Sequence, residues 1–247
     1  MLGVMENDIL RLFALALLPV VGMVLGALAA EKWRLSHRAL GAVLHAAAGV
    51  ATAVVSIELM PQALGNIAPW QLVVGFLLGA LVSVLMANGV RRAVKGLGLG
   101  QAGAWKVYLV TAVDLFGDGL MVGIGSAVAG GLGFVLALSQ VIANLPGGFV
   151  TVAQLRSRDV SRKIRLGAAA SLFVPVFIGA AAGYWLLRGQ SDAMQNAALA
   201  FVAGLLLLAT IEDLVPEADE PETPRWITTA SFAAGFCFFA LIALYVD

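Results

Sequence analysis

The chain has 247 residues, of which 61% are hydrophobic and only 12% are charged. Its 15 basic and 15 acidic residues give a formal net charge of zero, so charge provides no indication of a nucleic-acid partner. The single cysteine, Cys237, excludes a disulfide within the chain and a metal site built from several cysteines. This composition is typical of a multi-pass membrane protein.

Eight apolar runs are long enough to cross roughly 30 Å of hydrocarbon as helices. They cover residues 9–30, 41–64, 70–90, 107–130, 134–155, 166–187, 197–215 and 226–246. The first run follows Glu6 and Asp8 and lacks a small-residue cleavage pattern, so we expect a retained span and not a signal peptide. The sequence therefore predicts a single transmembrane domain over residues 1–247, and an inner-membrane location.

The basic residues predict the orientation of these spans. Thirteen of the 15 Lys and Arg residues follow spans 1, 3, 5 and 7: Lys32, Arg34, Arg38, Arg91, Arg92, Lys95, Lys106, Arg156, Arg158, Arg162, Lys163, Arg165 and Arg225. Only Arg11 and Arg188 fall on the other side. Because basic loops stay in the cytoplasm, both termini are expected outside.

Two short echoes predict an internal repeat. The second run ends ELMPQA (residues 58–63) and the seventh ends DLVPEA (213–218); more faintly, DLFGDG (114–119) in the fourth resembles ANLPGG (143–148) in the fifth. Each pair is separated by an odd number of spans, so its members point in opposite directions. We therefore expect an all-α, eight-helix bundle built as an inverted repeat of three, two and three spans, a plan common in secondary transporters.

Two aspartates lie near the middle of the fourth run. Asp114 and Asp118 are four residues apart and share one helix face. An ionised carboxylate at the bilayer centre costs about 2.5 to 3.5 kcal/mol, so two of them need a compensating partner, and the simplest one is a cation.

The fifth run carries matching polar groups. Gln140 and Asn144 repeat the four-residue spacing, and Pro146 leaves the carbonyl of Ile142 without its helical donor. We expect a helix break at Pro146, Gly147 and Gly148. With Asp114 and Asp118, the two amides form an oxygen-rich metal site suited to a divalent cation. A purely structural alternative is a protonated Asp118 that is hydrogen-bonded to Asn144 and ties two helices together.

Other acidic and amide groups lie toward the ends of spans 2 and 7. Glu58 and Gln62 are expected near the outer end of span 2, and Glu212, Asp213 and Glu217 at the cytoplasmic end of span 7. These residues could form a pathway for a cation. They could equally be solvated helix-end residues.

The layout and motifs resemble the ZIP family of divalent-metal transporters. The resemblance rests on the eight spans, on Asp118-Gly119 in span 4, on Asn144-x-Pro146-x-Gly148 in span 5, and on the Pro-x-Ala endings of spans 2 and 7. It implies a mid-membrane site for divalent metal, such as manganese, iron, zinc or magnesium, as the substrate, with no organic cofactor. Members of that family form dimers, so the resemblance also implies a homodimer.

Several residues depart from the pattern of that family. Asp114 stands in place of a histidine, Leu115 in place of an asparagine, Ala143 in place of a histidine or glutamine, and Gly147 in place of an acid; Val174-Pro175 replaces a glutamate before proline. The remaining ligands predict one metal site instead of two. Without imidazole or thiolate, that site should favour hard ions such as manganese, ferrous iron or magnesium.

The sequence leaves more than one class of function open. We expect a secondary carrier of divalent metal. The alternative is a ZIP-like protein that has lost metal transport and acts as a regulator or carries another solute. An enzyme is not expected, because the Asp-x-x-x-Asp-Gly segment departs from the acidic motif of CDP-alcohol phosphotransferases and no Ser/His pair or HExxH motif is present.

Overall fold

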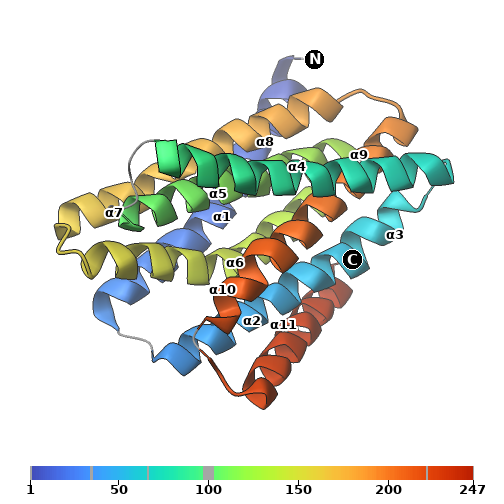
Figure 1. Cartoon of the computed structure of the whole chain (residues 1–247). Helices are drawn as coiled ribbons and strands as arrows, with labels where there is room; N and C mark the ends of the chain where they lie inside the picture. Colours follow the sequence, from blue (N-terminus) through green and yellow to red (C-terminus); the bar gives the residue numbers. More distant parts are fainter. Residues whose placement is uncertain (1, 34–35, 66, 97–102, 221, 247) are drawn as a thin grey trace.

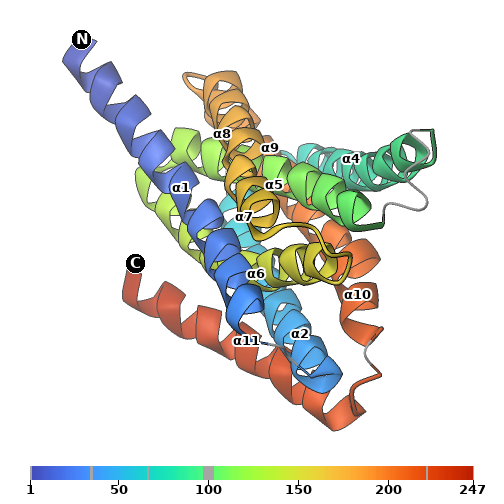
Figure 2. The same cartoon turned by 90° about the vertical axis from the view of Figure 1, so that its left-hand side faces the viewer.

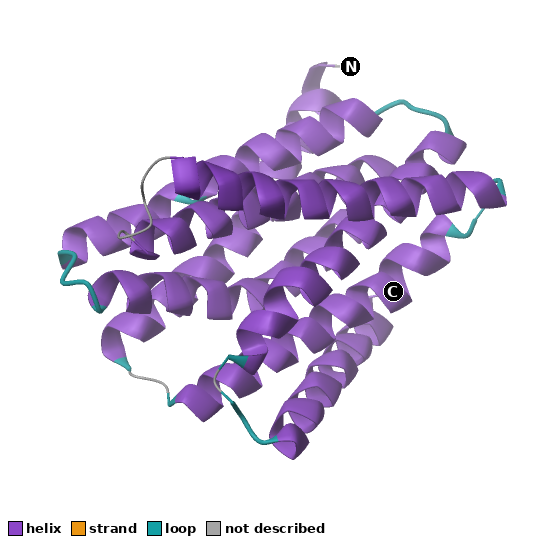
Figure 3. Ribbon diagram, viewed as in Figure 1, coloured by secondary structure: helices purple, strands orange, loops and turns teal. Residues whose placement is uncertain are grey.

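A computed structural model describes residues 2–33, 36–65, 67–96, 103–220 and 222–246, and this part of the chain contains helices and no strands (Figures 1 and 3). The elements are α1 (Leu2–Lys32), α2 (His37–Ala53), η1 (Val54–Leu59), α3 (Met60–Ala63), α4 (Pro69–Gly96), α5 (Gly103–Val128), α6 (Gly130–Arg156), α7 (Arg162–Ser171), α8 (Phe173–Leu187), α9 (Asp192–Ala209), η3 (Thr210–Leu214), α10 (Val215–Asp219) and α11 (Arg225–Val246), where η denotes a π-helical segment.

Eight helical spans in the described ranges are long and apolar enough to cross a membrane. The elements α2, η1 and α3 form span 2, α7 and α8 form span 6, and α9, η3 and α10 form span 7. The chain is thus an all-α, multi-pass membrane protein, as predicted. Helices extend past the apolar runs: α1 begins at Leu2 and α9 at Asp192, because polar residues continue a helix beyond the hydrocarbon.

The two ends of the bundle differ in charge. The α6–α7 and α10–α11 connections lie at one end and the α3–α4 and α8–α9 connections at the other (Figure 3). We call the first the basic end, since the segments with 13 of the 15 Lys and Arg residues lead to it, and the second the terminal end. The outermost spans are α4 and α11, of which 17% and 22% are buried, and both lie at the periphery of the bundle (Figure 2).

The helix contacts confirm the inverted repeat. Helix α1 packs along α6 as α8 packs along α5, and α4 packs along α9 as α11 packs along α2. When spans 1–3 are matched with spans 6–8 and span 4 with span 5, the α1–α6 pair maps onto the α8–α5 pair. The α4–α9 pair then maps onto the α11–α2 pair. The second spans of the two repeats also begin alike, because Ser36 caps α2 and Ser191 caps α9, each accepting a hydrogen bond from the backbone amide three residues on.

Glycines at matching positions bring these helices into backbone contact. A Cβ at Gly148 in α6 would collide with the carbonyl oxygen of Met23, and a Cβ at Gly119 in α5 would collide with that of Val176. These two glycines are also the matched final residues of the fainter sequence echo. Small residues allow close helix approach in membranes, so the echo records a shared packing requirement.

A π-helical turn interrupts spans 2 and 7 at the same place. In η1 the Met60 amide donates to the Val55 carbonyl, and in η3 the Val215 amide donates to the Thr210 carbonyl, both five residues back. The next residues are Pro61 and Pro216, which lack an amide proton and would crowd the carbonyl four residues earlier. The wider turn relieves that crowding, as π-bulges do elsewhere.

The predicted helix break in span 5 is wrong. Helix α6 is continuous from Gly130 to Arg156 through Pro146, Gly147 and Gly148. Proline costs only one backbone hydrogen bond there, and the close contact of Gly148 with α1 holds α6 along its neighbour. π-Helical turns precede Pro61 and Pro216 instead.

Candidate functional site

The centre of the candidate site is a buried pair on α5 and α6. Asp118 is 6% exposed and Asn144 is 4% exposed, and Asn144 Nδ2 donates a hydrogen bond of 2.8 Å to Asp118 Oδ2. This bond uses the amide nitrogen, so Asn144 Oδ1 stays available as an acceptor or ligand. The structure thus contains the Asp118–Asn144 hydrogen bond of the purely structural alternative, and the same bond brings two of the predicted ligands together.

Asp114 lies one turn from Asp118 toward the basic end and is exposed. Its charge interacts with that of Asp118 and with that of Asp213. Asp213 lies in η3, which continues α9, and α9 packs against α5. Glu217 in α10 interacts with both Asp114 and Asp213. We call Asp114, Asp213 and Glu217 the acidic patch; all three side chains are exposed.

The acidic patch and Asp118 form a continuous series of interacting carboxylates. It begins at a buried position in the middle of α5 and reaches α10 near the basic end. Among the described side chains, no Lys or Arg forms an ion pair with Asp114 or Asp118. Closely spaced carboxylates produce a negative potential that attracts cations.

Gln140, the predicted fourth ligand, is hydrogen-bonded to a sulfur atom. Its amide is buried and Nε2 donates to Met121 Sδ at 3.8 Å, one turn beyond Asp118 toward the terminal end. The structure thus brings Asp118 and Asn144 together and directs Gln140 to a sulfur. The spacing of Gln140 correctly indicates the helix face, but the side-chain direction depends on packing across two helices.

Sequence reasoning missed a second polar contact between α5 and α6. The hydroxyls of Thr111 and Thr151 lie 3.1 Å apart and are buried, two turns from the Asp118–Asn144 bond toward the basic end. Thr111 precedes Asp118 by seven residues and Thr151 follows Asn144 by seven, so both contacts belong to one seam. The seven-residue spacing in both helices could have indicated this contact. It is a weak signal, because threonine is common in membrane helices.

The site occurs only once within the inverted repeat. The echo that aligns Gly119 with Gly148 also aligns Asp118 with Gly147 and Asn144 with Leu115. Leu115 is fully buried and apolar, and Gly147 has no side chain. The mirrored location therefore has no polar pair.

The predicted pathway residues fall into two environments. Glu212, Asp213 and Glu217 are exposed toward the basic end. Glu58, which matches Asp213 in the repeat, is 5% exposed within η1, and Gln62 is half-buried. A row of solvent-accessible acids is present on the basic side, whereas its counterpart toward the terminal end is largely buried.

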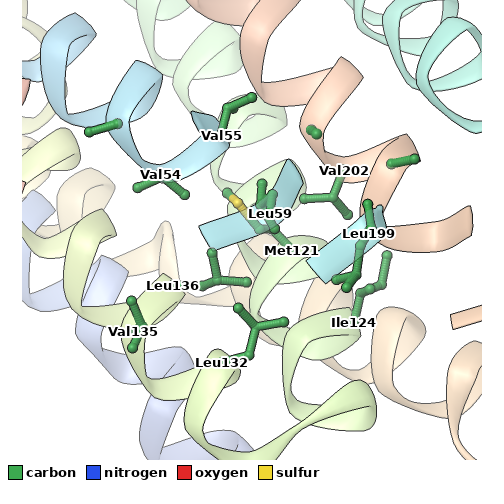
Figure 4. Close-up of a cluster of buried hydrophobic side chains, with 14 of the residues drawn as sticks. Val54, Val55, Leu59, Met121, Ile124, Leu132, Val135, Leu136, Leu199 and Val202 are labelled. Carbon is green, nitrogen blue, oxygen red and sulfur yellow. The ribbon is translucent and has the colours of Figure 1, made fainter. Parts of the chain in front are cut away.

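An apolar cluster fills the terminal half of the interface between the spans. It includes Val55 and Leu59 from span 2, Met121 from α5, Leu136 from α6 and Val202 from α9 (Figure 4). These residues lie toward the terminal end in every contributing helix, and their burial excludes water there. In this conformation the carboxylate series is thus closed off from the terminal end.

In the described part of the chain, no three His, Cys, Asp or Glu side chains are grouped as a complete metal-binding set. The central donors are two carboxylates and an amide, which fits a cation that keeps part of its water shell.

No family model matches the chain, and no curated protein matches its sequence.

Proposed function

We propose that this protein is a ZIP-like secondary transporter that moves a divalent metal cation across the inner membrane through one site at Asp118, Asn144 and Asp114. The observation that carries the proposal is the series of interacting carboxylates from buried Asp118 to exposed Glu217. Such a series lowers the energy of a cation at each step from the basic end to mid-membrane.

The donor chemistry supports a hard divalent ion. Asp118 and Asp114 supply carboxylate oxygens and Asn144 supplies an amide oxygen. Hard cations such as Mg²⁺ and Mn²⁺ use these ligands and retain water, so an incomplete protein shell also allows release, which a carrier requires. In this mechanism the ion takes the place of the Asn144 N–H donor beside Asp118, and the Asn144 side chain turns its oxygen toward the ion.

Transport is tested by Mn²⁺ uptake into proteoliposomes. We expect Asp118→Ala to reduce uptake by at least about 100-fold, because even outer-shell partners of a metal site are worth 10- to 100-fold. Asp192→Asn, which changes an exposed carboxylate at the start of α9, is the matched control and should transport normally. Calorimetry should show one ion per wild-type chain. Equal uptake by wild type and Asp118→Ala would reject the proposal.

A second candidate is a ZIP-like protein without transport that acts as a regulator or carries another solute. The apolar cluster favours it, because its side chains fill the terminal half of the interface between the spans. Under this candidate the wild-type protein binds an ion at Asp118, but uptake equals that of protein-free liposomes. The binding and uptake measurements together therefore separate the two functions.

A further inference from the structure

A buried histidine connects span 2 with α10 near the basic end. His45 lies in α2 and is 8% exposed. Its Nδ1 lies 2.8 Å from the carbonyl oxygen of Gly41, one turn earlier in the same helix. Its Nε2 lies 3.3 Å from Oδ1 of Asp219, the last residue of α10. Each nitrogen of the imidazole ring therefore faces an oxygen atom.

These two oxygens determine how many protons the His45–Asp219 pair must hold. A carbonyl oxygen only accepts hydrogen bonds, so Nδ1 carries a proton and donates it to Gly41. In a neutral ring Nε2 then presents a lone pair to the ionised Asp219 carboxylate, and the contact is repulsive. When Nε2 also binds a proton, the ring becomes a cation and the contact becomes charge-assisted. The contact between span 2 and α10 is thus attractive only while the pair holds this additional proton.

The other charged groups near this pair are mostly acidic. Helix α2 packs against α6, α9, α10, α11, η1 and η3. Near the basic end these elements and the α10–α11 connection carry Arg156, Glu212, Asp213, Glu217, Glu220, Glu222 and Arg225, and α2 itself carries Arg38. Glu58 of η1 lies more than three turns from His45, and Asp192 of α9 lies at the terminal end. Among the residues that the structure describes, Asp219 is the carboxylate that forms an ion pair with His45.

The α10–α11 connection packs closely on α2 beside the pair. A Cβ at Gly41 would collide with the hydroxyl oxygen of Thr223 and would lie 3.2 Å from the carbonyl oxygen of Ala218. Within the described ranges the Thr223 hydroxyl is buried and has no hydrogen-bond partner, which disfavours the docked position. Helix α10 has only five residues and follows a π-helical turn. Docking of α10 is therefore opposed by one unpaired group and favoured by the protonated pair.

We propose that His45 and Asp219 form a proton-binding site that holds α10 against span 2. With the proton bound, α10 is docked as in the structure; when the proton is lost, the Nε2 lone pair repels the carboxylate and α10 moves away. Histidine exchanges a proton in the physiological pH range, and the Asp219 side chain is 58% exposed, so the site is connected to water. Release also moves Glu217, and with it the acidic patch, away from Asp114. Only this consequence for cation entry rests on the proposed function.

The test measures how firmly the α10–α11 connection is held. A nitroxide is attached to the thiol of Glu222→Cys in the full-length Cys237→Ser protein in nanodiscs, and its mobility is recorded by electron paramagnetic resonance. We expect the mobile fraction to be at least about threefold larger at pH about 8.5 than at pH about 5.5, because the site loses its proton over this range. Asp219→Asn should abolish the difference, because an amide can donate to neutral Nε2 and accept from the protonated ring.

Two further variants make the result specific to this pair. His45→Gln replaces the ring with a donor whose charge does not change with pH, so it should also abolish the difference. Glu220→Gln removes the adjacent exposed carboxylate and leaves the pair intact, so as the matched control it should keep the full pH response. An equal mobile fraction at both pH values without these substitutions, or a pH response that persists in both Asp219→Asn and His45→Gln, would overturn the proposal. The readout involves no metal, so an intact pH response without Mn²⁺ uptake would reject transport and support the proton site.

Discussion

Glu58 in η1 is buried, whereas Asp213, at the matching place in η3, is exposed and interacts with Asp114. The residues next to Glu58 in η1, such as Val55 and Leu59, belong to the apolar cluster. Asp213 instead belongs to the acidic patch, together with Asp114 and Glu217. The two halves share one backbone plan, including the π-helical turn, and differ in their side chains. The two repeats thus preserve the same helix packing. The exposed acidic groups of the candidate site are found around η3, whereas the matching surroundings of η1 are apolar.

The shared backbone plan is tested most strongly at its glycines. Gly119→Ala and Gly148→Ala should each lower the free energy of unfolding by about 3 kcal/mol, because each Cβ meets a carbonyl group of a neighbouring helix that cannot move away. Gly167→Ala, which meets nothing within 4 Å, is the control and should be neutral or slightly stabilising. Unfolding in mixed micelles measures all three. If the free energies of unfolding of Gly119→Ala and Gly148→Ala differed by more than about 2 kcal/mol, the two glycines would not be equivalent in packing.

The difference in access is tested by cysteine labelling. In a Cys237→Ser background, Asp114→Cys should react with a membrane-impermeant thiol reagent from the basic end. Its mirror, Ala143→Cys, should react at least about tenfold more slowly from either end, because it is half-buried and the apolar cluster closes the terminal half. Rapid labelling of Ala143→Cys from the terminal end would show that the apolar cluster opens in the membrane.

The repeat and the spans could be predicted from the sequence because both depend on local patterns. Hydropathy identifies apolar runs, and the glycine and Pro-x-Ala echoes mark packing requirements that are written within six residues. The π-helical turns could not be predicted in the same way. A proline indicates a disturbed turn, but Pro61 and Pro216 are accommodated by wider turns while Pro146 lies in a continuous helix. The neighbouring helices decide between these outcomes.

The candidate site was predictable in part for a similar reason. The four-residue spacings place Asp118 and Asn144 on facing sides of adjacent helices, which the hydrogen bond between them confirms. The direction of Gln140 and the approach of Asp213 to Asp114 depend on contacts between three spans.

The missing polar pair in the mirrored location can be partly restored. Gly147 aligns with Asp118, and a Cβ there would meet only the end of the Met23 side chain, at an ordinary contact distance of 3.5 Å. We expect Gly147→Asp to add a carboxylate beside Asn144 and to tighten Mn²⁺ binding about tenfold, or to raise the calorimetric stoichiometry from one ion to two. Ala143→Ser changes polarity without adding charge and is the control. Unchanged binding in a folded Gly147→Asp protein would indicate that the two halves are not equivalent at this depth.

The smallest effect is expected at the edge of the acidic patch. Asp213→Asn removes one charge from a solvent-exposed group, so it should weaken Mn²⁺ binding only about threefold at low ionic strength, in keeping with the screened interactions of exposed charges. Titrations at low and high salt measure this effect, which should vanish at about 0.5 M salt because the Debye length is then only about 4 Å. The mirrored change, Glu58→Gln, removes a buried group with a partner of its own and should instead lower protein stability while leaving the salt dependence of binding unchanged. If Asp213→Asn acted equally at both salt concentrations, Asp213 would be a direct ligand of the ion, and the site would extend from α5 and α6 into η3.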